Sequence, residues 1–224
     1  MLKLGAVQVI SPTMPEDQIN QILRTPGVYH TPGHFQYPVS EGGKVGNHLD
    51  SLFLIEPIVK EDQFVEWIVD DICRWIDAEK LEFDVIFAPA QMAVTFIVEK
   101  LAKRLNVRKA YLEYTYAGWF GTELVEGEIN KSDRVLLFNG ITHQGRCVGE
   151  RLPHFVENIG AKVVAAAVFA KSTTAGVIAT EQHYGTKFYA AVQVDIKVAT
   201  PQDCEQCLLE SIPELTPWTK LRDS

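Results

Sequence analysis

The sequence has few cysteines, little positive charge and no long apolar run. Its 224 residues carry 21 Lys and Arg against 29 Asp and Glu, a formal net charge of −8. No Lys/Arg run offsets this acidic average, so we predict that nucleic acid is not a main partner. The longest apolar run, Val163 to Ala170, has the length of a strand and falls short of the roughly 18 residues that span a membrane. The N-terminus lacks a basic region with a cleavage site. We therefore predict a cytoplasmic protein without membrane contact.

The four cysteines are too few for a disulfide scaffold and fit a reducing compartment. Only Cys204 and Cys207 are close, as a Cys-x-x-Cys pair. Zinc would need two more ligands from elsewhere, so we prefer a plain C-terminal turn and keep a metal or redox site as the alternative. A loop-rich N-terminal segment offers other ligands: His30, His34, His48 and Asp50. No helical spacing aims these at one point, and we assign no metal site.

Several enzyme motifs are also absent, namely the Gly-x-Ser-x-Gly elbow, the Walker loop and His-Glu-x-x-His.

The chain does contain predicted helices and predicted strands that alternate along the sequence. Amphipathic spacing predicts helices over residues 61–80 and 91–105, and further helices fall at 146–159 and at 12–25, with Thr13 as a candidate N-cap. Apolar runs predict strands at 83–88, 107–114, 135–138, 163–170 and 188–194.

Alternating strands and helices predict an open parallel sheet covered on both faces. Ligands of such sheets bind beyond the carboxyl ends of the strands. Three segments would meet there: Ala88–Gln91, Asn139–Arg146 and Lys171–Gly176. The middle one closes the stretch RVLLFNGITHQGR, which has the layout of a strand that leads into an anion-binding loop and then a helix.

Two stretches carry a family resemblance. DVIFAPAQMAVTFIVEKLAKRL and DRVLLFNGITHQGRCVGE, some forty residues apart, resemble the type I phosphoribosyltransferases, in particular the orotate phosphoribosyltransferase-like branch. GVYHTPGHFQYPVSEGG looks like that branch's N-terminal hood segment, and TPQDCEQCLLESIP looks like a Cys-x-x-Cys tail found in some members. The resemblance covers roughly residues 25 to 215. It implies a parallel α/β sheet with a small hood, in which residues 1–60 form the hood, 61–200 the core and 201–224 a tail that completes the hood.

The resemblance also implies a donor site with several parts. Two carboxylates that hold the ribose hydroxyls fall on Asn139 and Gly140. The cradle for the 5-phosphate falls on the loop that follows: Thr142, His143, Gln144, Gly145 and Arg146. We expect the cradle either to bind phosphate or to be a plain strand-to-helix turn. For the lone His143 we prefer a solvated ring over a catalytic one.

Two further segments would serve the pyrophosphate leaving group. The turn at Ala90 and Gln91 lacks the glycines of the family, and we prefer a helix start that packs on the sheet. The mobile loop, with Glu113, Tyr114, Tyr116 and Trp119, should be basic, yet no Lys, Arg or His occurs between Lys109 and Lys131. We read it as a hairpin that packs a ring-shaped ligand or seals a dimer interface.

The acid pair, the glycine turn and the basic loop are therefore all altered. We expect a homodimeric protein that binds a nucleotide or phosphosugar and has lost ordinary phosphoribosyl transfer; no catalytic residue is assigned. Two alternatives remain. One is an active enzyme, either a pentosyltransferase that uses Mg²⁺ or one of changed chemistry. The other is a structural, protein-binding partner.

Overall fold

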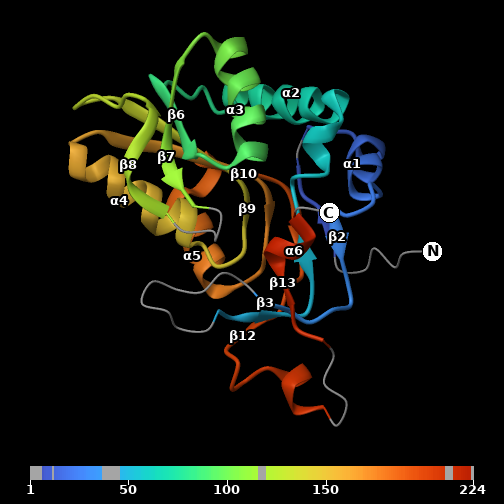
Figure 1. The fold of residues 1–224 in the computed structure, drawn as a ribbon. Helices are drawn as coiled ribbons and strands as arrows, with labels where there is room; N and C mark the ends of the chain where they lie inside the picture. The colour runs from blue at the N-terminus through green and yellow to red at the C-terminus, as the bar shows by residue number, and fades with distance from the viewer. Residues whose placement is uncertain (1–6, 12, 37–45, 116–119, 210–213, 223–224) are drawn as a thin grey trace.

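The computed structural model describes residues 7–11, 13–36, 46–115, 120–209 and 214–222. Its centre is a seven-stranded sheet in the order β1-β11-β10-β9-β6-β7-β8 (Figure 1). The strands are β1 (Val7–Val9), β6 (Val85–Pro89), β7 (Arg108–Tyr114), β8 (Phe120–Gly127), β9 (Arg134–Thr142), β10 (Lys162–Lys171) and β11 (Phe188–Val194). The strands from β11 to β7 run parallel, while β1 and β8 close the two edges antiparallel. The predicted α/β class is confirmed.

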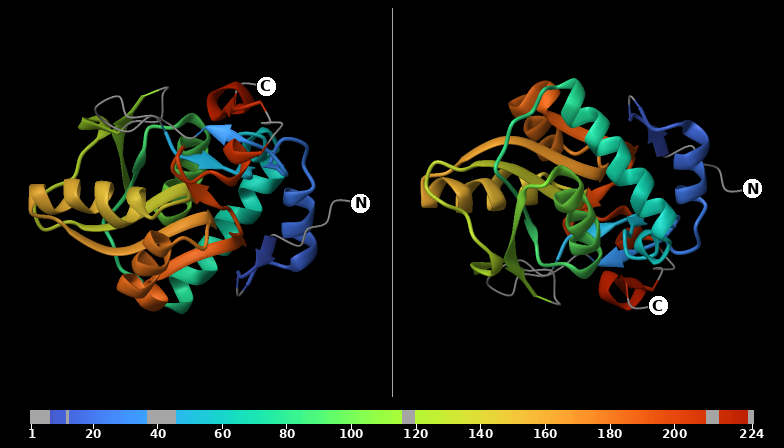
Figure 2. Two further views of the ribbon diagram at one scale, coloured as in Figure 1. Left: turned by 90° about the horizontal axis from the view of Figure 1, so that it is seen from below. Right: turned by 90° about the horizontal axis from the view of Figure 1, so that it is seen from above.

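Helices cover both faces of this sheet (Figure 2). Side chains alternate along each buried strand, so that Ile86 packs with α2 (Asp62–Ala78) and α3 (Met92–Leu105). Phe87 points the other way, toward α4 (Leu152–Ile159) and α5 (Ala175–Tyr184). A π-helical turn, η2 (Cys147–Arg151), leads into α4. No helix in the described ranges is long and apolar enough to cross a membrane.

A smaller part of the molecule combines strands from the N-terminal quarter of the chain with strands from the C-terminal tail. Its four-stranded sheet has the order β12 (Val198–Ala199), β4 (His48–Leu49), β3 (Phe35–Gln36), β13 (Thr216–Pro217). A two-stranded sheet pairs β2 (Tyr29–His30) with β5 (Leu52–Phe53). The short elements nearby are α1 (Glu16–Leu23), η1 (Ile58–Lys60), η4 (Glu205–Leu208) and α6 (Trp218–Arg222); η3 (Gly185–Lys187) precedes β11. This is the small hood of the predicted fold (Figure 1); the domain boundaries at residues 60 and 200 remain predictions.

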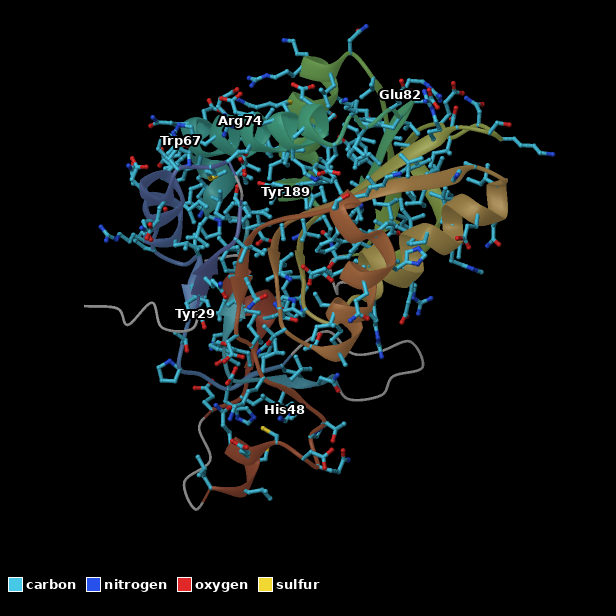
Figure 3. All side chains as sticks on the ribbon, turned by 180° about the vertical axis from the view of Figure 1, so that it is seen from behind. Tyr29, His48, Trp67, Arg74, Glu82 and Tyr189 are labelled. Atoms are coloured by element: carbon cyan, nitrogen blue, oxygen red, sulfur yellow. The ribbon has the colours of Figure 1, made fainter. Side chains whose placement is uncertain are left out.

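The N-terminal segment differs from the sequence prediction. Pro15 rather than Thr13 precedes the first residue of α1, and the Thr13 hydroxyl donates instead to the carboxylate of Asp71 on α2. Ser11 donates to the same carboxylate at 2.6 Å, as does the hydroxyl of Tyr189, which Figure 3 labels. A fully buried carboxylate needs such donors, and this need outweighs the local capping preference of Thr13.

Candidate functional site

The strand at the centre of the site is longer than the sequence predicts. We expected a strand over residues 135–138 and a loop from Asn139, but β9 continues to Thr142. Asn139 lies opposite Val168 of β10, and Thr142 lies opposite Lys171. Pairing with a ten-residue neighbour extends the strand, so the loop itself is reduced to residues 143–146.

The Asn139 side chain is bonded to its own strand. Its Oδ1 accepts the Gly140 N–H at 2.8 Å, and its Nδ2 donates to the Ile141 carbonyl at 3.2 Å. The side chain also hydrogen-bonds Cys147, although burial is the larger effect there and raises the pKa of that thiol to about 11. Asn139 is therefore a buried positioning group that brings no charge.

Gly140 lies directly against the hood. A Cβ added at this position would stand 2.7 Å from Cδ1 and 2.9 Å from Cγ2 of Ile55. Both contacts are closer than real Cβ atoms approach their neighbours. An apolar side chain thus occupies the space in which a second carboxylate would have to stand.

The short loop is fastened to the next strand-helix connection. Gly145 has φ +79°, and its N–H donates to the Thr142 hydroxyl at 3.2 Å. The His143 carbonyl accepts the hydroxyls of Ser172 at 2.5 Å and Thr174 at 2.7 Å. A Cβ at position 145 would meet the Gly176 carbonyl oxygen at 2.4 Å. The loop therefore needs glycine at position 145 for both conformation and space.

His143 corrects another prediction. We expected a solvated ring, but His143 is only 4% exposed, and this burial lowers its pKa to about 4. The hydroxyls of Ser172 and Thr174 hold the His143 backbone carbonyl, a long-range contact that the local sequence does not reveal. The ring is accordingly neutral near pH 7.

The loop ends in a cation near the surface. Arg146 is exposed, Gln144 is half-buried, and η2 begins one residue after Arg146. A second cation, Lys171 at the end of β10, is buried and forms an ion pair with Glu181. We had placed Lys171 at the crevice without assigning it a role; its burial beside a carboxylate only becomes visible once α5 packs against β10.

The turn predicted to meet the leaving group packs as a helix start. The Ala90 N–H donates to the Leu112 carbonyl at 2.8 Å, and Gln91 directly precedes α3. The Gln91 amide donates to Glu56 Oε1 at 2.8 Å, and Glu56 is buried. This hood carboxylate is one that sequence reasoning missed.

The predicted hairpin after β7 is present, since β8 pairs with β7 antiparallel and Tyr114 lies opposite Phe120. Their ring centroids are 5.3 Å apart. Glu113 is exposed at the end of β7. Tyr116 and Trp119, which we assigned to the mobile loop, lie outside the described residues.

These segments enclose one pocket at the carboxyl ends of the strands. Its volume of about 40 Å³ holds a few water molecules. Apolar and polar groups share the lining about equally, and it contains neither lysine nor arginine: Leu52, Phe53, Leu54, Ile55, Glu56, Gln91, Tyr114, Asn139, Ile141, His143, Cys147 and Trp218. The lining therefore offers aromatic surface from Tyr114 and Trp218 and no cation that would pair with a pyrophosphate.

The fold is that of several solved phosphoribosyltransferases. A UMP synthase from Leishmania donovani superposes with TM-score 0.55 at 18% identity, over 79% of this chain and 36% of that one. This chain therefore spans about a third of that protein. Orotate phosphoribosyltransferase from Aeropyrum pernix gives TM-score 0.56 at 15% identity over 78% and 92%. Adenine phosphoribosyltransferase from Trypanosoma brucei gives 0.56 at 13% over 97% and 98%.

No protein-family model and no curated protein matches the sequence. At such low identities the superpositions show the fold alone. The type I phosphoribosyltransferase fold, predicted from the degenerate motifs, is confirmed.

Proposed function

We propose that this protein binds a nucleotide or phosphosugar at the carboxyl ends of its central strands without carrying out ordinary phosphoribosyl transfer. The observation that carries the proposal is the contact between Gly140 and Ile55. Space for the second carboxylate of a donor site is filled, and Asn139 supplies an amide in place of the first.

The absence of carboxylates at positions 139 and 140 matters for the reaction because of charge. Phosphoribosyl transfer develops positive charge at the sugar carbon, and nearby negative charge stabilises that state. Positions 139 and 140 also offer no carboxylate for a magnesium ion, which prefers carboxylate and phosphate oxygens. Magnesium does not fit these residues, and we derive no step through it.

Binding rests on a different set of groups. Tyr114 and Trp218 offer aromatic surface at the pocket, while Arg146 and the backbone around Gly145 offer a cation and a glycine turn at the loop. With room for only a few water molecules, the pocket must widen to admit a ligand.

Calorimetry tests the binding proposal. Nucleoside monophosphates, and phosphoribosyl pyrophosphate with Mg²⁺, are titrated into the protein and into Arg146→Ala. Arg24→Ala, an exposed arginine beside α1, is the matched control. We expect binding that weakens in Arg146→Ala only. Silence from every phosphate ligand contradicts the proposal, and rapid pyrophosphate release with a panel of bases contradicts the loss of transfer.

A second candidate is an enzyme of changed chemistry, favoured by one specific observation. The Glu56 carboxylate and the neutral His143 ring line the same pocket, one from the hood and one from the core. Such a pair resembles a general base with a polar partner. Turnover of a nucleotide-like substrate that is abolished in Glu56→Gln would favour this candidate over pure binding.

The assembly state is part of the proposal. We infer a homodimer, supported by Met92 and Phe96, which are 67% and 52% exposed and lie one turn apart on α3. Light scattering of the protein and of a Met92→Lys/Phe96→Lys variant measures the mass. A monomeric wild type contradicts the dimer and leaves the ligand proposal standing.

A further inference from the structure

The hood brings together four side chains that lie far apart in the sequence: His34, His48, Cys204 and Cys207. One ligand atom from each, two ring nitrogens and two sulfurs, lies within 4.8 Å of all the others. Three of the residues are buried, and Cys207 is half-buried. Figure 3 shows His48 beside a sulfur atom at the end of the molecule away from the central sheet.

Most of the separations between the ligand atoms are close to those of a tetrahedral site. Bond lengths to zinc of about 2.1 Å for nitrogen and 2.3 Å for sulfur require about 3.4 Å between two nitrogens and about 3.6 Å between nitrogen and sulfur. His34 Nε2 and His48 Nδ1 are 2.9 Å apart. The sulfur of Cys207 lies 3.5 Å and 3.2 Å from these nitrogens, and that of Cys204 lies 3.5 Å from His34 Nε2. These four separations lie within about half an ångström of the tetrahedral values, and the two other pairs lie within 4.8 Å, so shifts of up to about one ångström would seat an ion.

Strand pairing aims the two histidines. Phe35 pairs with Leu49 and Gln36 with His48, so His34 and His48 are diagonal neighbours on the same face of the β3–β4 pair. The Gly33 N–H donates to the Asp50 carbonyl at 2.9 Å and continues this pairing past His34. The register of the β3–β4 pair therefore brings the two imidazole rings together, although the sequence spacing of the two histidines does not predict this.

The tail supplies the two cysteines. Ala199 of β12 lies opposite His48, and the turn that follows, closed by the Asp203 N–H on the Thr200 carbonyl at 3.1 Å, returns the chain over the histidines. The Cys207 N–H donates to the Cys204 carbonyl at 3.0 Å, which turns both sulfurs to one side. The Gln206 amide also donates to the Gly33 carbonyl at 2.5 Å and fixes this turn beside His34.

We propose that His34, His48, Cys204 and Cys207 bind one zinc ion in a closed, structural site that fastens the C-terminal tail to the hood. Two thiolates and two imidazoles in a tetrahedral arrangement suit zinc better than magnesium or calcium, which take oxygen ligands. Four protein ligands leave no open position for a reacting water. Asp50 and His30, the other candidates in this segment, bond elsewhere: Asp50 accepts from Ser51 and His30 contacts the Gly27 carbonyl.

The site has a consequence for the crevice. After the cysteines the tail contributes β13, which pairs with β3 next to His34, and then Trp218, which lines the pocket. An ion that fixes the turn at Cys204 and Cys207 thereby limits where this second half of the tail can lie. This proposal rests on the hood alone and does not depend on what the pocket binds.

Metal content is the first test. The full chain is produced with zinc, freed of any tag, dialysed under reducing conditions and measured by inductively coupled plasma mass spectrometry. We expect about one zinc per chain. Cobalt(II) exchanged into the site should give the absorption bands of tetrahedral cobalt with thiolate ligands. X-ray absorption should report two sulfur and two nitrogen neighbours.

Variants assign the ligands. Cys204→Ser, Cys207→Ser and His48→Ala should each lower retained zinc at least about tenfold after dialysis against a mild chelator. Cys73→Ser, Cys147→Ser and His30→Ala are matched controls outside the cluster and should retain it.

The alternative is a hydrogen-bonded cluster without metal, since the same short separations would allow one. Wild-type protein that holds neither zinc nor cobalt after reconstitution under reducing conditions would overturn the proposal. Zinc bound equally well by wild type and by Cys207→Ser would do the same. If the cysteine variants fail to fold, the wild-type stoichiometry and the cobalt spectrum still decide.

Discussion

The crevice at the carboxyl ends of the sheet and the histidine-cysteine cluster in the hood are two potential sites built in opposite ways. The crevice draws on contiguous motifs in which an amide and a glycine stand where the family resemblance would place two carboxylates, and Ile55 lies against that glycine. The cluster joins one Cys-x-x-Cys pair to two histidines far away in the sequence, yet the four ligand atoms lie within 4.8 Å of one another. The crevice is thus visible in the sequence as a motif, whereas the cluster becomes visible only when its residues are brought together in space.

The largest expected effect contrasts one cysteine from each region. Cys207→Ser should lower the melting temperature by about 10 °C or more, because losing a structural metal costs several kcal/mol. Cys147→Ser, at the pocket, should change it much less. Differential scanning calorimetry with and without chelator measures both. Equal melting temperatures for wild type and Cys207→Ser would contradict a stabilising metal site in the hood.

The buried histidine of the crevice predicts a pH dependence. The folded-state pKa of His143 is lowered to about 4 by burial, against an ordinary value near 6.5, so the unfolded chain binds more protons between these values. The contribution of His143 to stability is complete above pH 6.5 and is lost as the pH falls toward 4, by roughly 3 kcal/mol at most.

Urea unfolding of wild type and His143→Gln at a series of pH values isolates this residue, because the carboxylates that titrate in the same window are common to both. We expect a shallower loss of stability in the variant between pH 6.5 and 4. Parallel curves would show that His143 is not buried in solution.

The contact between Gly140 and Ile55 predicts a coupled pair. Gly140→Ala should cost about 1–3 kcal/mol because its Cβ overlaps Ile55. In an Ile55→Ala background the same change should cost less, since the overlapping atoms are gone. A double-mutant cycle by chemical unfolding measures this coupling. Independent, additive effects would mean that the hood does not fill the site.

The smallest expected effect on stability is that of Arg146→Ala. This exposed side chain should change the free energy of unfolding by no more than about 0.5 kcal/mol. A phosphate ligand, by contrast, should bind clearly more weakly. Thermal shifts with and without nucleoside monophosphates separate the two. A ligand-induced shift that is the same in wild type and Arg146→Ala would remove the phosphate cradle from the site.

Much of the core could be read from the sequence. Four of the five parallel strands and the helices α2, α3 and α4 appear close to the predicted ranges, because buried apolar runs and amphipathic periodicity are local properties of the chain. The strand β9 extends four residues beyond its predicted end, and α5 was not predicted. The β7–β8 hairpin was also predicted from its glycines and aromatic residues. Residues outside this periodicity fared worse: β1 was not predicted, and Thr13 bonds Asp71 instead of capping α1.

The candidate site was predictable in place but not in detail. Its segments meet at the predicted edge of the sheet, since the carboxyl ends of parallel strands must lie together. The contact of Ile55 with Gly140 and the hydrogen bonds to the His143 carbonyl come from the hood and from the 172–174 connection, which lie elsewhere in the chain.

The sequence by itself determined the α/β core and the edge of the sheet where the candidate site lies, because hydrophobic periodicity is a property of neighbouring residues. It also determined the missing carboxylates, because residue identity decides charge. Only the tertiary structure decided which side chains meet. Strand register in the hood places His34 beside His48, and the return of the tail brings Cys204 and Cys207 to them across some 160 residues. Such convergence depends on long-range pairing, which no local pattern in the sequence encodes.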